Sequence, residues 1–111
     1  MKIFGVGTDI IRVSRVKNSL KNKLFVSRIF NNEEVSKCNK NLNRSNCFAK
    51  RFAAKEAFSK ALGTGIAKGI KFNEIVILNE KNGKPFIKLL NNTKKVVSKK
   101  IKKKNIKFPY Q

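Results

Sequence analysis

The sequence predicts an α+β fold in one domain that spans all 111 residues. Residues 47–62 carry a helical apolar pattern, whereas 72–78 and 86–90 are short apolar runs typical of strands. Asn82 and Gly83, between these two runs, are a strong signal for a β-hairpin. A hydrophobic fraction of 41% is enough for one modest core.

Residues near the N-terminus change their spacing within the first twenty positions. Residues 2–10 alternate with a period of two, which predicts a strand that ends near Asp9. Val13, Val16 and Leu20 then follow the spacing of a short helix. The predicted order at this end is therefore strand, then helix.

Further helices are predicted on both sides of the hairpin. Residues 25–48 combine helix and loop, and Asn31 and Asn32 before Glu33 and Glu34 predict an N-cap with acids in the first turn. The long helix 47–62 is stopped by glycine. A last helix is expected at 93–104, with a thin apolar stripe.

The composition is strongly basic, with 27 Lys and Arg against 6 Asp and Glu and a formal net charge of +21. Such a charge favours a phosphate-rich or acidic partner. A basic nucleic-acid-binding protein is one alternative, and it predicts salt-sensitive binding to DNA or RNA. However, the chain has one Tyr and no Trp, and its Phe residues stand at core spacing, which offers little for base recognition. Nucleic acid is therefore an unlikely partner.

Several classes of site are excluded by what the sequence lacks. The chain contains no His, so a Ser-His-Asp triad is excluded and a zinc site is improbable. Cys38 and Cys47 could close a disulfide, but a chain with its own core does not require one, so reduced thiols are expected. No signal peptide or membrane span is predicted, which indicates a cytoplasmic protein.

Two carboxylates stand in apolar surroundings. In a helix, Glu56 shares an arc with Ala49, Phe52 and Ala53, and Asp9 ends the predicted strand. A carboxylate out of water costs several kcal/mol unless it is paired or binds a metal. If strand and helix pack together, the two acids meet, and without His or a Cys cluster they suit Mg²⁺ with substrate phosphates.

Basic residues around this pair would neutralise phosphate oxygens: Lys60, Lys55, Arg51 and Arg44. Gly63 and Gly65 would allow close approach of the backbone. This set predicts transfer from a phosphate-containing donor. The alternative is an exposed ion pair from Glu56 to Lys60, worth only a few tenths of a kcal/mol.

Three motifs resemble a known family. GVGTDI (5–10) with Arg15 downstream, RFAAKEAFSKALGTGI (51–66) and NGKP (82–85) are similar to the holo-[acyl-carrier-protein] synthases, small bacterial 4′-phosphopantetheinyl transferases. The similarity covers roughly residues 3–90. It implies a small, mainly antiparallel sheet packed with a long helix, in a homotrimer with active sites between subunits.

The resemblance implies a reaction and a set of site residues. Family members move phosphopantetheine from coenzyme A to a serine of apo acyl carrier protein and release adenosine 3′,5′-bisphosphate. Asp9 and Glu56 fall where the family binds Mg²⁺ and the coenzyme A diphosphate, and Glu56 would also orient or deprotonate the attacking serine. Lys60 falls at a phosphate contact. The adenine end would lie at the hairpin residues Asn82, Gly83, Lys84 and Pro85.

The resemblance also assigns a surface for the acidic carrier protein, formed by Arg15, Phe25, Arg28 and Phe52. The sequence differs from the family at 105–111, NIKFPYQ, where family members carry a strand with a Ser-x-Ser/Thr-His pattern. An impaired member that binds coenzyme A or carrier protein without turnover is therefore a second alternative.

Overall fold

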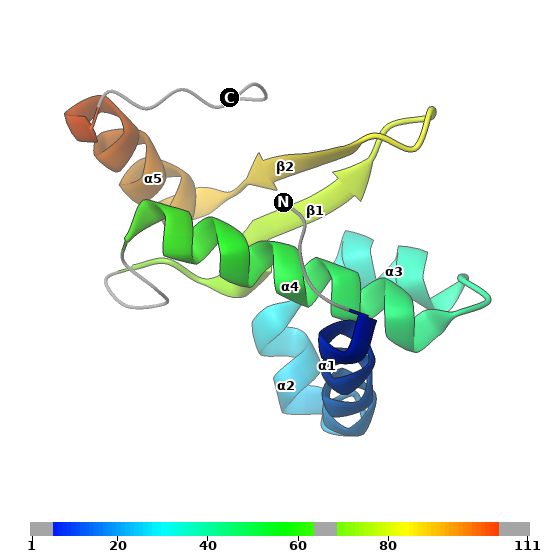
Figure 1. Ribbon diagram of the computed structural model, residues 1–111. Helices are drawn as coiled ribbons and strands as arrows, with labels where there is room; N and C mark the ends of the chain where they lie inside the picture. Colours follow the sequence, from blue (N-terminus) through cyan, green and yellow to red (C-terminus); the bar gives the residue numbers. More distant parts are fainter. Residues whose placement is uncertain (1–5, 64–68, 105–111) are drawn as a thin grey trace.

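The computed structural model describes residues 6–63 and 69–104. In chain order these residues form α1 (Val6–Ser19), α2 (Lys23–Ile29), α3 (Asn32–Asn39), α4 (Arg44–Leu62), the 3₁₀ turn η1 (Phe72–Glu74), β1 (Ile75–Asn79), β2 (Pro85–Leu89) and α5 (Asn91–Lys104) (Figure 1). The predicted α+β class is confirmed. No helix in these two ranges is long and apolar enough to cross a membrane.

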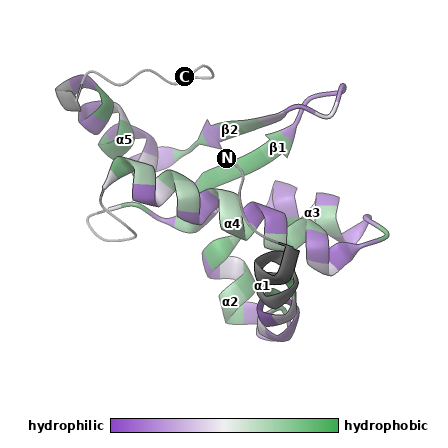
Figure 2. Ribbon diagram, viewed as in Figure 1, coloured by the Kyte–Doolittle hydropathy of each residue, from purple (hydrophilic) through white to green (hydrophobic). Residues whose placement is uncertain are grey.

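Helix α4 is the central element, because it contributes to both apolar clusters of the described residues (Figure 1). Its N-terminal half packs with α1, α2 and α3 around Phe48, while its C-terminal half packs with the hairpin and α5 around Leu62. The half-buried Phe52 packs against both clusters. Figure 2 shows the apolar character of β1, whose first three residues are buried.

The predicted hairpin is confirmed. β1 and β2 pair antiparallel from Ile75 opposite Leu89 to Asn79 opposite Pro85. Gly83 has a φ of 89°, a conformation that glycine adopts without strain. The first strand begins later than predicted because Phe72–Glu74 form η1, in which the Glu74 N–H donates to the Lys71 carbonyl at 3.0 Å.

Helix ends follow the predicted capping chemistry. The Asn31 side chain accepts from the Glu33 N–H and the Glu34 carboxylate accepts from the Asn31 N–H, so α3 begins with a capping box. Helix α4 ends at Gly63, whose φ of 76° is left-handed. It begins at Arg44, three residues before the predicted start, because Asn43 caps it by accepting from the Asn46 N–H.

The predicted N-terminal strand is wrong where the structure describes it. Residues 2–5 lie outside the described part of the chain, and 6–10 form the first turns of α1. The helical spacing of Val13 and Val16 extends backward through this segment, because each residue added to an existing helix gains a hydrogen bond.

The expectation of reduced thiols is also wrong, because Cys38 and Cys47 form a disulfide. The Cα–Cα distance is 5.4 Å, and the bond joins α3 to α4 inside the apolar cluster around Phe48. Composition alone cannot predict this pairing, since it depends on the polar turn that returns α4 alongside α3.

Reduction of this disulfide should lower the free energy of unfolding by about 2–3 kcal/mol, because the unfolded chain regains the freedom of a short loop. Urea unfolding with and without a reductant measures the change. Alkylation of the denatured protein should label both cysteines only after reduction. Labelling of both without a reductant would contradict the disulfide.

Glu74 caps the N-terminus of α5. Its carboxylate accepts from the Thr93 N–H at 3.2 Å, the Thr93 hydroxyl at 2.7 Å and the Asn91 side chain at 3.2 Å. Burial by itself raises the pKa of Glu74, but the hydrogen bonds from Thr93 and Asn91 outweigh it and lower the pKa below 4.5. The ionised carboxylate therefore stabilises the fold.

Replacement of Glu74 with Gln should cost about 1 kcal/mol of unfolding free energy at neutral pH, as for the loss of a helix cap. Because the folded-state pKa is depressed, this contribution is present above the unfolded pKa and is lost as the pH falls through the folded one. Urea unfolding of wild type and variant should therefore converge in strong acid. The control is Glu80→Gln, in the exposed hairpin turn; an equal effect there would contradict the cap.

Candidate active site

A cavity of about 470 Å³ lies between α4, the turn that precedes it and the turn end of the hairpin. Its lining is rich in amide and basic side chains: Asn41, Asn43, Asn46, Cys47, Lys50, Arg51, Ala54, Ile77, Asn79 and Pro85. Asparagine side chains both donate and accept hydrogen bonds. Such a lining suits a ligand with a heterocyclic base and anionic groups.

Two of the residues predicted to bind coenzyme A, Pro85 and Arg51, line this cavity. Pro85, the last residue of NGKP, lines it, and in the turn the Asn82 side chain accepts from the Lys84 N–H at 3.0 Å. Arg44 is exposed at the start of α4, where its guanidinium donates to the Asn39 side chain at 2.8 Å and lies 5.1 Å from the Phe48 ring centroid. Lys50, which also lines the cavity and is exposed, was missed by the sequence analysis.

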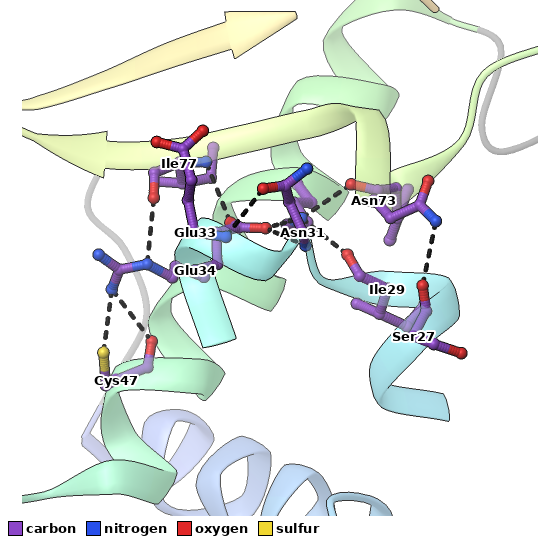
Figure 3. A network of polar contacts seen from close by, with 11 residues as sticks. Ser27, Ile29, Asn31, Glu33, Glu34, Cys47, Asn73 and Ile77 are labelled. Carbon is purple, nitrogen blue, oxygen red and sulfur yellow. Dashed lines mark hydrogen bonds and ion pairs between the residues drawn. The ribbon is translucent and has the colours of Figure 1, made fainter. Parts of the chain in front are cut away.

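Arg51 contributes to the wall of the cavity, but its guanidinium donates hydrogen bonds mainly to other groups of the protein. It is buried, and its guanidinium donates to the Ile77 carbonyl at 3.1 Å and to the Cys47 sulfur at 3.1 Å (Figure 3). It also donates to the Asn79 side chain at 3.0 Å. Burial lowers the pKa of Arg51, against the opposite effect of the Glu34 charge. In this structure Arg51 therefore holds β1 against α4, which differs from the expected phosphate contact.

Lys55 differs most from its expected role, because its side chain is fully buried. Its Nζ lies 2.6 Å from Glu34 Oε1, 2.7 Å from the Ile29 carbonyl oxygen and 2.8 Å from that of Phe72. Burial lowers the pKa of Lys55 to about 8, although the Glu34 carboxylate raises it. All three ammonium protons are thus used inside the protein, and none points to a phosphate.

The orientation of α4 about its own axis explains why Lys55 is buried and does not lie at a phosphate site. Phe48, Lys55 and Leu62 recur every seven residues and are all buried, so they share the inner face of the helix. The arc that was predicted to face inward is less buried, since Ala49 is buried but Phe52 and Glu56 are half-buried. The acid that balances Lys55 is Glu34, which was considered only as an acid of the first turn of α3. Glu34 stands four residues before the buried Cys38, so the two side chains share one face of α3. This spacing was the sequence signal that Glu34 faces the core.

The predicted metal ligands are placed on two helices that pack together, since α1 contacts α4. Glu56 is half-buried on α4, and Lys60, one turn further on, is exposed. Asp9 belongs to α1, and its side chain lies outside what the structure describes. The described residues contain no group of three or more His, Cys, Asp or Glu that could hold a metal ion. Two carboxylates with substrate phosphates therefore remain the predicted ligand set.

The glycines after α4 are only partly described. Gly63 ends the helix and is exposed, whereas Gly65 lies in 64–68, outside the described ranges.

The predicted carrier-protein surface separates into exposed cations and half-buried rings. Arg15 on α1 and Arg28 on α2 are exposed. The Phe25 and Phe52 rings are half-buried, and their centroids lie 6.1 Å apart. The rings therefore also belong to the core, where they support the helices that carry the two arginines.

Residues 5–107 match the 4′-phosphopantetheinyl transferase superfamily. The chain belongs to this superfamily. The match spans α1 to α5, so all of the elements described above lie within it. The resemblance found in the sequence motifs is confirmed.

Among curated proteins, the chain is 43% identical over 108 residues to the holo-[acyl-carrier-protein] synthase of Pelagibacter ubique, covering 97% of this chain and 84% of that protein. A crystal structure of the holo-[acyl-carrier-protein] synthase from Neisseria meningitidis is 34% identical and superposes with a TM-score of 0.69, covering 86% of this chain and 74% of the other. The acyl carrier protein synthase of Plasmodium yoelii with ADP bound is 32% identical, with a TM-score of 0.58 over 79% and 69% of the two chains. The fold of this transferase superfamily member is therefore shared with solved synthases.

Proposed function

We propose that this protein transfers 4′-phosphopantetheine from coenzyme A to a serine of apo acyl carrier protein, yielding holo carrier protein and adenosine 3′,5′-bisphosphate. The observation that carries the proposal is the superfamily match over residues 5–107. The names of relatives such as the Pelagibacter ubique synthase support the carrier protein as the acceptor.

The cavity beside the hairpin is the proposed site for the adenosine end of coenzyme A. Its asparagine amides would meet the edge of the base, and Lys50 and Arg44 would approach its phosphates. The ADP bound to the Plasmodium yoelii protein supports a nucleotide site in this fold. Lys60 would contact the diphosphate from the next turns of α4.

Glu56 is the proposed catalytic residue, assisted by Lys60. A half-buried carboxylate can accept the proton of the attacking serine, directly or through a water, when the carrier protein docks against Arg15 and Arg28. Asp9 and Glu56 would hold Mg²⁺, which neutralises charge on the diphosphate when it is bound. Hard oxygen ligands and the absence of His fit this ion.

The proposed function is tested by incubating the protein with coenzyme A, Mg²⁺ and apo carrier protein, followed by mass spectrometry of the carrier. The carrier should gain the mass of phosphopantetheine, and a chelator should prevent the gain. An unchanged carrier mass at every protein concentration would refute the transfer and favour an impaired member that only binds coenzyme A or carrier protein.

Lys50→Glu should raise the KM for coenzyme A by about tenfold, the cost of losing one charge-assisted contact. Initial rates at varied coenzyme A concentration measure it. Lys99→Glu, the same charge reversal on the exposed face of α5, is the matched control. An equal rise in KM for both variants would indicate a general loss of positive charge and would contradict a contact in the cavity.

We also propose that the protein acts in the cytoplasm as a homotrimer, as the family resemblance implies. Light scattering coupled to size exclusion tests the assembly, and a monomeric mass would refute it.

A further inference from the structure

The buried ion pair between Lys55 and Glu34 joins most elements that surround α4 (Figure 3). Both side chains are fully buried, and their charged atoms lie 2.6 Å apart. Lys55 also binds the carbonyl oxygens of Ile29, at the end of α2, and Phe72, in η1. One ammonium group thus fixes α4 to three separate segments.

The carboxylate end extends the network to the sheet. Glu34 Oε1 accepts from the Asn31 N–H at 2.9 Å, and Oε2 accepts from the Ile77 N–H in β1 at 3.0 Å (Figure 3). Apart from the ion pair itself, every hydrogen bond that these two side chains make in the structure is to a backbone group. Backbone groups move only with their elements, so the network defines how α3, α4, η1 and β1 sit relative to one another.

We propose that Lys55 is a positioning residue, which acts with Glu34 to set the placement of α4 and thereby that of Glu56. Lys55 immediately precedes Glu56, so a rotation or slide of α4 that displaced the Glu56 carboxylate would break the contacts of Lys55. The inference rests on the proposed catalytic role of Glu56.

Stability alone does not account for this pair. A buried ion pair replaced by apolar side chains of similar volume is often neutral or stabilising. Fixed geometry is what the pair adds, and small displacements of a catalytic group are costly, since a shift of about 1 Å can lower the rate by about 100-fold. The pair therefore acts by holding α4, and with it Glu56, in place.

The test is the double variant Lys55→Met/Glu34→Gln, which removes both charges and leaves the net charge unchanged. We expect kcat to fall by about 10- to 100-fold, while the KM for coenzyme A changes by less than about threefold, because neither Lys55 nor Glu34 lines the cavity. The matched control is Lys88→Met/Glu33→Gln, the same change in an exposed pair at 3.2 Å, and it should retain wild-type kcat.

Circular dichroism shows whether the double variant is folded. If it does not fold, Glu34→Asp supplies the same test, because it keeps the charge but withdraws the carboxylate from Lys55 and from the Ile77 N–H. It should lower kcat by about tenfold, with Glu33→Asp as its control.

The outcomes are distinct. The positioning role would be overturned if the folded double variant, or Glu34→Asp, kept wild-type kcat while Glu56→Gln was inactive. Transfer that survives in Glu56→Gln would instead overturn the catalytic role proposed for Glu56.

Discussion

Replacing Glu56 with Gln is expected to lower kcat/KM for phosphopantetheine transfer by about 10²- to 10⁴-fold. The amide keeps the size of the side chain but can neither accept the serine proton nor bind Mg²⁺ as a charged ligand. The loss should persist at saturating carrier protein and coenzyme A, because the group acts on the chemical step.

The fold should survive this change, because Glu56 is half-buried and the substitution preserves its volume. Circular dichroism and urea unfolding check this point, and Glu33→Gln on the exposed side of α3 is the control. An active Glu56→Gln enzyme would exclude both the general-base and the metal-ligand roles.

The second large effect is expected for Lys55→Met, which should lower the free energy of unfolding by about 3–5 kcal/mol. The variant leaves the fully buried Glu34 carboxylate without its cation, together with two carbonyl oxygens that have lost a donor. Such a loss is a large part of the 5–15 kcal/mol that typically stabilises a domain.

Urea unfolding at neutral pH measures this effect. Lys88→Met removes a cation from the exposed Glu33 pair and should change the unfolding free energy by at most about 1 kcal/mol. Equal small changes in the two variants would contradict the burial of the Lys55–Glu34 pair.

Local chemistry explains which elements the sequence predicted well. The hairpin depends on Asn82 and Gly83, the end of α4 on Gly63, and the start of α3 on Asn31. Each signal acts through neighbouring residues, so it can be read without the tertiary structure. The family motifs likewise lie in continuous stretches.

The predictions that were wrong concern residues whose placement depends on segments far away in the sequence. Lys55 is buried only because Glu34 and two backbone carbonyls meet it from other elements, and a basic residue in a lysine-rich helix gives no local sign of this. The Cys38–Cys47 bond depends on how α3 and α4 pack. The alternation in residues 2–10 suggested a strand, but alternation cannot say whether a partner strand is available.

The contacts made by the backbone of Ile77 affect the solubility of the protein. On the side of β1 away from β2, its N–H is taken by Glu34 and its carbonyl by Arg51. In the described part of the chain, this is one of the two edges at which a further strand could add to the two-stranded sheet. Charged side chains that occupy an edge in this way prevent edge-to-edge pairing with another molecule. The two residues thus protect a very apolar strand from self-association while the chain is folded.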